Sequence, residues 1–274
     1  MSNILVNIKG LDSKEFPKGV TPLQIMKDIK GVSKDSIICK IDGELKDLSS
    51  TLKKDCELQF MDAKSKDGHS VLLHSTAHLM AQAVKRLFPK TKVTIGPYLE
   101  NRFYYDFDVE TPFTEDDLLK IENEMIKISE ENHEITHEVK SRDEALNYFE
   151  KIKENYKVEI INDLDTDEIL KVYSQGEFTD LCRGPHVQST GQIKHFKLLS
   201  SSAAYWRGDE KNQTLQRVYG TSFQNGKDLK KYLLMLEEQK KRDHRKIGKE
   251  LDLFFFDEEV GPGLPLWTPS GTVL

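Results

Sequence analysis

Two histidines four residues apart, His74 and His78, are the first side chains in the sequence that could do chemistry together. They lie in HSTAHLMAQAVKRLF (74–88), where apolar residues recur at three- and four-residue steps, as on one face of a helix. Both imidazoles would therefore project from that face about one turn apart and could hold one small group. Such pairs are often surface or core histidines, so this spacing is a weak signal.

A second pair, Cys182 and His186, lies in DLCRGPH. Gly184 and Pro185 stand between the two and forbid a regular helix, so a turn must bring them together. Three histidines and a cysteine in two pairs match the ligand count of a zinc site, and they equally match a hydrolytic pocket of proton-transfer groups. The plainer alternative makes Cys182 a small buried side chain and His186 a turn residue.

The elements that must position these pairs begin with a small sheet domain. Short apolar runs predict strands at residues 4–8, 36–41 and 56–60. Between the first two, Thr21 can cap a helix that has Pro22 at its first position and Gln24 three residues after the cap. Strands around one helix in about 60 residues indicate a small α+β domain.

The polar segment 62–70 has no periodicity and predicts a linker at a domain boundary. Beyond it we expect the helix over 74–88, and then strands in KVTIGPYL and NRFYYDFDV around a Gly96-Pro97 turn. A capping box at Thr114 and Asp117 starts another helix. The last long helix is expected from about Asp228 to Glu250 and carries the basic run 240–246.

The chain has 274 residues, which suggests about two domains at roughly 150 residues each. Its net charge of -6 argues against nucleic acid as a partner. That average hides an uneven distribution, because residues 110–134 hold nine acids and two lysines, whereas 227–250 holds nine basic and five acidic residues. The basic segment is therefore a candidate phosphate contact.

No apolar run approaches the roughly 18 residues that a membrane span needs, and no apolar core of a signal peptide follows Met1. The three cysteines, Cys39, Cys56 and Cys182, are widely spaced and form no CxxC pair, which fits a reducing compartment. We therefore expect a cytoplasmic protein with no membrane partner.

Several segments closely resemble the bacterial-type threonyl-tRNA synthetases, in the same order and over essentially the whole chain. The segments are HSTAHLMAQAVKRLFP, IGPYLENRFYYDFD, DLCRGPHV, AYWRGDEKNQTLQRVYGTSF and EEQKKRDHRKIGKELDLF. The related alanyl editing domains share both pairs but usually carry glycine and threonine between cysteine and histidine, where RGP stands here.

The resemblance implies a domain order. It implies a ubiquitin-like β-grasp (TGS) domain over 1–62, a two-part α+β editing domain over 63–225, a linker helix over 226–248, and the truncated start of a class II catalytic domain over 249–274.

The function that the resemblance implies is proofreading: hydrolysis of the ester in seryl-tRNA for threonine. Serine lacks one methyl of threonine, and a binding pocket discriminates one methyl by only about 1–3 kcal/mol. A second, smaller site would hydrolyse the seryl product and exclude the threonyl one. The parent enzyme attaches threonine to tRNA with ATP, so the expected partners are the 3′ acceptor end of threonine tRNA and an esterified serine or threonine.

The resemblance also implies the site residues. His74, His78, Cys182 and His186 would be catalytic, together with Lys157 for an oxyanion or the ribose oxygens and Asp180 for the substrate ammonium. Tyr105 would also line the pocket and contact the substrate. Each of the last three has a plainer alternative: Lys157 as a solvated lysine, Asp180 as a turn cap, and Tyr105 as strand core.

Trp206 and Arg207 offer a stacking surface and a phosphate-binding cation for a single-stranded RNA end. The alternative places Trp206 in the core. Alanyl editing domains bind zinc through the corresponding four residues, but resemblance to the threonyl enzymes favours metal-free hydrolysis here, with zinc as the rival.

ATP, magnesium and the zinc of the catalytic domain would need residues beyond this sequence, so we expect an ester hydrolase without aminoacylation activity. The full enzyme is expected to be a homodimer, and for this chain a monomer is one alternative. Two alternatives stay open: a non-catalytic tRNA-binding module, which the intact His and Cys pairs oppose, and a free-standing trans-editing protein, which the class II-like segment 251–274 opposes.

Overall fold

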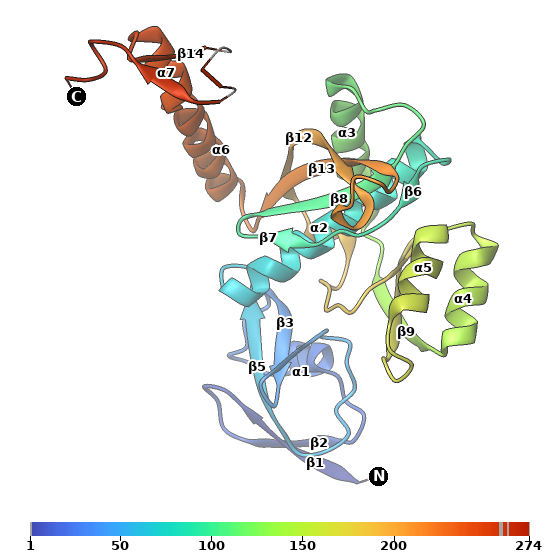
Figure 1. Ribbon diagram of the computed structural model, residues 1–274. Helices are drawn as coiled ribbons and strands as arrows, with labels where there is room; N and C mark the ends of the chain where they lie inside the picture. Colours follow the sequence, from blue (N-terminus) through green and yellow to red (C-terminus); the bar gives the residue numbers. More distant parts are fainter. Residues whose placement is uncertain (1, 258–259, 262, 274) are drawn as a thin grey trace. The chain divides into compact units, whose positions relative to one another are not determined.

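The computed structural model describes residues 2–257, 260–261 and 263–273, and its mixture of helices and several sheets confirms the predicted α+β class (Figure 1). The chain divides into two units, Met1–Asn225 and Gly226–Leu274. Among the described residues, no helix combines the length and apolarity needed to cross a membrane.

The first unit opens with a five-stranded mixed sheet and helix α1 (Pro22–Asp28). The strands are β1 (Asn3–Ile8), β2 (Lys14–Pro17), β3 (Ser36–Ile41), β4 (Glu44–Lys46) and β5 (Cys56–Asp62), in the order β2-β1-β5-β3-β4. The three predicted strands are confirmed as β1, β3 and β5, and Thr21 and Gln24 form the predicted capping box of α1. The sequence analysis missed β2 and β4 because both are short and carry few apolar residues.

Helix α2 (Lys66–Leu87) corrects the predicted linker, because it begins eight residues before the expected start at 74. Ser65 caps it by accepting a hydrogen bond from Gly68 N at 3.1 Å. Gly68 is needed because a Cβ there would lie 1.9 Å from the carbonyl oxygen of Asp62. The polar segment therefore holds a tight helix start, and only residues 63–65 separate β5 from α2.

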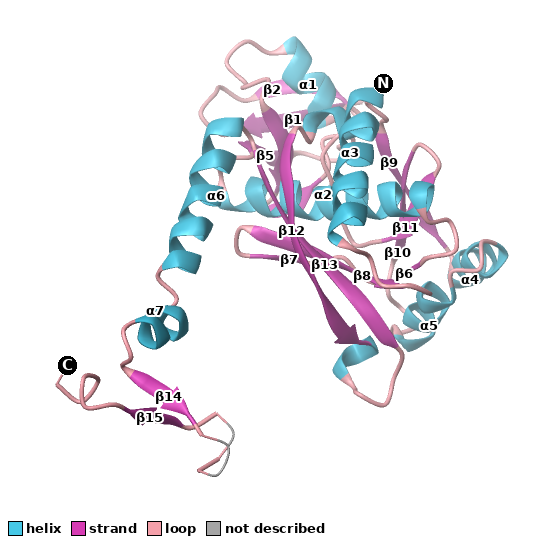
Figure 2. Cartoon of the chain, turned by 90° about the horizontal axis from the view of Figure 1, so that it is seen from above, coloured by secondary structure: helices cyan, strands magenta, loops and turns pink. Residues whose placement is uncertain are grey.

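Helix α2 packs against a second five-stranded antiparallel sheet and against α3 (Glu115–Glu131). Figure 2 shows α2 running across the direction of the long strands of this sheet. The strands are β6 (Lys92–Val93), β7 (Tyr98–Leu99), β8 (Arg102–Asp108), β12 (His195–Tyr205) and β13 (Thr214–Phe223), in the order β12-β13-β8-β6 with β7 paired to β8. Leu72, Met80 and Val84 of α2 share a buried core with the aromatic residues of β8. The predicted capping box at Thr114 is confirmed at the start of α3.

The strand expected over KVTIGPYL is interrupted, which corrects that prediction. Only Lys92–Val93 and Tyr98–Leu99 are strands, and the turn between β7 and β8 lies at residues 100–101 rather than at Gly96-Pro97. Gly96 instead allows a close approach to β8, because a Cβ there would lie 2.3 Å from the ring of Tyr105.

A third, antiparallel sheet is formed by β9 (Ile135–Lys140), β10 (Leu170–Gln175) and β11 (Phe178–Leu181), in the order β11-β10-β9. Helices α4 (Arg142–Lys151) and α5 (Asn155–Asp163) share a small core with it through Ala145, Phe149 and Ile161 (Figure 1). Two short 3₁₀ segments, η1 (Thr190–Gln192) and η2 (Trp206–Gly208), precede and follow β12. The segment after β11 carries the CRGPH turn.

The second unit corrects the single long helix expected up to Glu250. It holds α6 (Gly226–Lys241) and α7 (His244–Glu250), separated where Asp243 caps α7 by accepting from Arg245 N at 2.9 Å. A two-stranded sheet of β14 (Phe254–Phe256) and β15 (Pro265–Trp267) follows. Of the predicted class II-like segment, residues 258–259, 262 and 274 lie outside the described residues.

Candidate active site

The structure brings the two sequence pairs into one group, which we call the His/Cys cluster: His74, His78, Cys182 and His186. Helix α2 carries the first pair, and the turn after β11 carries the second. One ligand atom from each residue lies within 4.8 Å of every other. The ring centroid of His186 is 4.6 Å from that of His74 and 4.3 Å from that of His78.

Hydrogen-bond geometry fixes where the protons of the cluster sit. His74 Nδ1 lies 3.1 Å from the carbonyl oxygen of Gly96, which can only accept, so Nδ1 carries the ring proton and Nε2 keeps its lone pair. That Nε2 lies 2.9 Å from Cys182 Sγ, so the thiol donates to it. The sulfur then accepts from His186 Nε2 at 3.3 Å, and the Ser75 hydroxyl donates to His186 Nδ1 at 3.0 Å.

Burial keeps this cluster uncharged at neutral pH. Removal from water lowers the pKa of His74 and lowers the pKa values of His78 and His186 well below their usual range, with the neighbouring imidazoles adding to the shift of the last two. Burial likewise raises the pKa of the Cys182 thiol to about 12. The site therefore offers neutral imidazoles that can accept a proton, and a thiol that keeps its own.

Three further predicted residues form a buried polar triad beside His78: Tyr105, Lys157 and Asp180. The Lys157 ammonium forms an ion pair with Asp180 and donates to Tyr105 Oη at 3.1 Å. Tyr105 in turn donates to Asp180 Oδ2 at 2.6 Å. The same carboxylate oxygen lies 3.6 Å from His78 Nε2, which joins the triad to the His/Cys cluster.

The burial of the triad limits the plainer alternatives for two of its members. Lys157 is only 2% exposed, so it is no solvated lysine, and it also donates to the carbonyl oxygen of Thr94 at 2.5 Å. Asp180 is equally buried and caps no turn, because it lies within β11. The ring of Tyr105, on β8, does lie in the hydrophobic core, but its hydroxyl donates to Asp180.

Access to the cluster is from the side of His74 and Cys182, which are half-buried, whereas His78 and His186 are buried. The ring of Tyr98, 49% exposed, lies 6.4 Å from that of His74 between centroids. Ile95 is also exposed nearby in the chain. One exposed aromatic ring, that of Tyr98, therefore lies beside the half-buried His74.

Trp206 and Arg207 do not join the cluster. Trp206 is 7% exposed and packs against Tyr156, with ring centroids 4.9 Å apart, and against Leu215, while its indole N–H donates to Glu159 at 3.0 Å. Arg207 forms an ion pair with Asp163. This packing favours the core alternative for Trp206, because a ring enclosed in this way leaves little surface on which a base could stack.

The basic run 240–246 lies at the end of α6 and the start of α7. Acidic neighbours already pair with most of its cations: Glu238 with Lys241 and Arg242, and Asp243 with Arg245. These exposed pairs are weak. A phosphate would have to compete with these carboxylates, so fewer cations of the run are available to bind phosphate than the charge count indicates.

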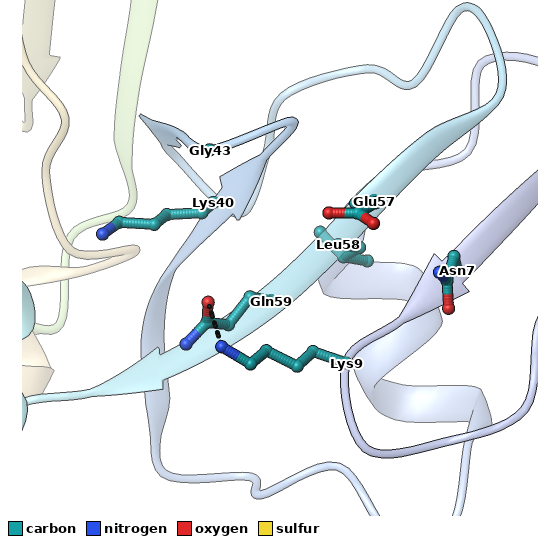
Figure 3. Close-up of a pocket in the computed structure, with 7 residues that line it drawn as sticks. All are labelled: Asn7, Lys9, Lys40, Gly43, Glu57, Leu58 and Gln59. Atoms are coloured by element: carbon teal, nitrogen blue, oxygen red, sulfur yellow. Dashed lines mark hydrogen bonds between the residues drawn. The ribbon is translucent and has the colours of Figure 1, made fainter.

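The N-terminal sheet carries a different hollow of about 260 Å³, shown in Figure 3. Lys9 donates to Gln59 there at 3.4 Å, and Glu57 supplies a carboxylate. Lys40, which also lines it, forms an ion pair with Asp67 at 2.6 Å. None of the described residues that line the hollow carries an imidazole or a thiol, so the His/Cys cluster is the stronger candidate for chemistry.

Sequence reasoning missed several residues that hold the cluster in place. Ser75 orients His186, the Gly96 carbonyl fixes the tautomer of His74, and Thr94 accepts from Lys157 through its backbone. Two of these partners are backbone oxygens, which leave no mark in a sequence. Ser75 stands next to His74, but serines on helices are common, and only the fold shows that it faces His186.

The residues of the cluster also fit a zinc ion. Three imidazoles and one thiol supply the nitrogen and sulfur ligands that zinc prefers, and the Nε2 atoms of His74 and His186 both face the sulfur. Zinc held by three of the four residues would leave one position for a carbonyl or a water, on which it would act as a Lewis acid. It would require the thiolate form of Cys182, whose pKa burial raises to about 12.

Comparisons with known proteins identify similar chains. The family model described as the threonyl and alanyl tRNA synthetase second additional domain matches residues 170–219, which include β10, β11 and the CRGPH turn. A threonine–tRNA ligase of Pelobacter propionicus is 52% identical over 275 residues, covering 100% of this chain and 43% of the relative.

Relatives with the same name are 51% identical in Anoxybacillus flavithermus, covering 95% of this chain and 41% of the relative, and 47% identical in Rickettsia peacockii, covering 97% and 42%. The chain thus spans about two fifths of the length of the curated relatives that it matches.

Proposed function

The chain is a homologue, over its whole length, of threonine–tRNA ligases, and on this premise we propose that it hydrolyses the ester of seryl-tRNA for threonine at the His/Cys cluster. One observation carries the proposal: the hydrogen-bond chain from Ser75 through His186 and Cys182 ends at the unprotonated Nε2 of His74, a half-buried side chain. An unprotonated imidazole nitrogen is what a general base for water requires.

In the proposed reaction a water replaces the Cys182 thiol as the donor to His74 Nε2. As the water oxygen attacks the ester carbonyl, His74 takes one of its protons, and the carbonyl oxygen becomes an oxyanion. The C–O bond to the ribose then breaks, and the ribose oxygen receives the proton from His74. The products are free serine and tRNA with its terminal hydroxyl restored, so atoms and charge balance.

The buried polar triad supplies fixed charge for this reaction. Lys157 provides the cation that favours an oxyanion, and the Asp180 carboxylate favours the ammonium of the esterified serine. Because the two side chains already pair with each other, their positions are set before the substrate arrives, and little reorganisation is needed. Threonyl-tRNA would be excluded by its extra methyl, in keeping with a second sieve smaller than the first.

We propose that the hydrolysis is metal-free and that the acceptor end of threonine tRNA is the partner. The neutral cluster supports this, since Cys182 has hydrogen-bond partners without a metal: His74, His186 and the backbone N–H of Gly184. We do not extend the proposal to ligation of threonine to tRNA with ATP, because this chain matches only about two fifths of the length of the threonine–tRNA ligases.

The test uses the 274-residue chain in excess over seryl-tRNA and threonyl-tRNA for threonine, with release of the amino acid followed over time. We expect faster loss of serine than of threonine, and expect His74→Ala to abolish that difference. His244→Ala, an exposed histidine of α7, is the matched control and should behave as wild type. Equal rates of serine release by wild type and His74→Ala would contradict hydrolysis at the His/Cys cluster and would favour the tRNA-binding module.

A parallel assay decides the metal question. Metal analysis of the purified chain should find no stoichiometric zinc, and dialysis against a chelator should leave the hydrolysis rate unchanged. Stoichiometric zinc that is lost in His78→Ala would overturn metal-free hydrolysis.

A further inference from the structure

A buried carboxylate of the N-terminal sheet reaches the His/Cys cluster. Asp47 follows β4 directly and is 7% exposed. Its Oδ1 accepts a hydrogen bond from the backbone N–H of His186 at 2.8 Å, across 139 residues of sequence. Its Oδ2 accepts from the hydroxyl of Tyr173 at 2.8 Å and lies 3.7 Å from Nδ1 of His137.

Tyr173 extends the hold of Asp47 to the rest of the turn. Its ring lies 4.5 Å from that of His186 between centroids. Gly184, at φ +69°, packs so closely that a Cβ there would lie 1.9 Å from Tyr173 Oη. Asp47 therefore fixes the backbone of His186 directly and supports the middle of the CRGPH turn through Tyr173.

The surrounding packing shows that this contact is part of an interior. Ile37 and Ile38 of β3 belong to the same buried core as Val71 of α2 and Val187, which follows the turn. Gln188 also donates to the carbonyl oxygen of Ser36 at 3.3 Å. The apolar contacts join the N-terminal sheet to the rest of the first unit, while Asp47 alone among these residues bonds to the cluster itself.

We propose that Asp47 is a positioning residue for the hydrolysis, which makes the N-terminal sheet a working part of the active site. The proposal rests on the proposed function of the His/Cys cluster. The reason is geometric: His186 Nε2 faces Cys182 Sγ at 3.3 Å, and the sulfur faces His74 Nε2 at 2.9 Å, so a displaced His186 misaligns the whole chain. A misplacement of about 1 Å in an active site can cost a factor of about 100 in rate.

Two substitutions at Asp47 separate hydrogen bonding from packing. Asp47→Ala removes both acceptors, and we expect the rate at saturating enzyme to fall by about 10- to 100-fold. Asp47→Asn keeps an acceptor for the His186 N–H and can donate to Tyr173 Oη, so it should recover part of that loss. Glu44→Gln, an exposed carboxylate on β4, is the matched control and should keep the wild-type rate.

The experiment measures hydrolysis of seryl-tRNA in single turnovers over a range of enzyme concentrations, with urea unfolding of each variant alongside. Positioning predicts a lower saturating rate with an unchanged half-saturating concentration, whereas loss of folded protein raises the apparent half-saturating concentration. If Asp47→Ala does not fold, Tyr173→Phe takes its place, because it removes one of the two donors and should lower the same saturating rate.

The outcomes are distinguishable. A wild-type chain that hydrolyses no seryl-tRNA overturns the proposed function and this proposal with it. An active wild type overturns the role of Asp47 alone if its folded Asp47→Ala variant, or Tyr173→Phe in its place, keeps the wild-type saturating rate. A fall in that variant, with a smaller fall in Asp47→Asn, supports the role.

Discussion

Replacing Lys157 by methionine removes one member of the buried polar triad and leaves Asp180 without its cation. Both side chains are 2% exposed. Methionine has nearly the length of the lysine stem, so the change removes the charge and its hydrogen bonds with little loss of packing. The variant therefore isolates the electrostatic part of the site.

The expected cost follows from the contacts that are lost. Two unit charges about 4 Å apart attract by about 4 kcal/mol at an effective dielectric constant near 20, and this pair is closer. Breaking a buried pair typically costs about 3–5 kcal/mol, because the remaining charge stays buried and unpaired. We expect Lys157→Met to lower the free energy of unfolding by that amount, and Lys157→Met with Asp180→Leu to cost less than the two single changes added together.

Tryptophan fluorescence can report this loss from the correct unit. The chain has two tryptophans, Trp206 in the first unit and Trp267 in the second. Trp267 is 60% exposed, so Trp267→Phe provides a background in which Trp206 alone follows urea unfolding of the first unit. The midpoint and slope of each transition then give the free energies.

The surface pair of Lys127 and Glu124 serves as the control. Lys127 is 66% exposed at its side chain, and Lys127→Met should cost less than about 1 kcal/mol. A cost for Lys157→Met no larger than this, or a double variant whose cost equals the sum of the single costs, would refute the reasoning about the buried pair.

Three other predictions concern the turn, the helix start and pH. Gly184→Ala should lower stability by about 1–3 kcal/mol and abolish hydrolysis, because the new Cβ meets Tyr173 Oη, and kinetics with urea unfolding tests both. Ser65→Ala should cost about 1 kcal/mol by removing the cap on Gly68 N, and Ser65→Asp should not. The buried histidines of the cluster have lowered pKa values in the folded state, so their contribution to the free energy of unfolding is complete above the unfolded pKa of about 6.5 and is lost as the pH falls below it. The loss is up to about 1.4 kcal/mol per histidine at pH 5.5. A urea midpoint that is equal at pH 7.5 and pH 5.5 would contradict this.

Local signals in the sequence predict local structure well in this chain. The capping boxes at Thr21 and Thr114 are found as expected, because a side-chain cap depends only on residues three apart. The start of α2 at Lys66 differs from the expected start for the opposite reason. Gly68 weakens the helix pattern, and its value lies in a close contact with the Asp62 carbonyl that the sequence does not reveal.

The site residues likewise fall into those that local sequence spacing indicates and those that only the fold brings together. The spacing of His74 and His78 indicates that they share a face, but only the fold brings Cys182 and His186 beside them. Only the family resemblance indicates Lys157 and Asp180, since a lone lysine and a lone aspartate form no pattern. Asp47 was missed altogether, because it acts across 139 residues and stands in an ordinary polar turn.

The most direct test of the central claim is the ratio of two single-turnover rates. The 274-residue chain, free of added metal, should hydrolyse seryl-tRNA for threonine more than about tenfold faster than threonyl-tRNA, since one methyl excluded from a small site is worth at least that factor. Equal rates for the two substrates, or no hydrolysis of either, would contradict the assignment of the His/Cys cluster as a proofreading site.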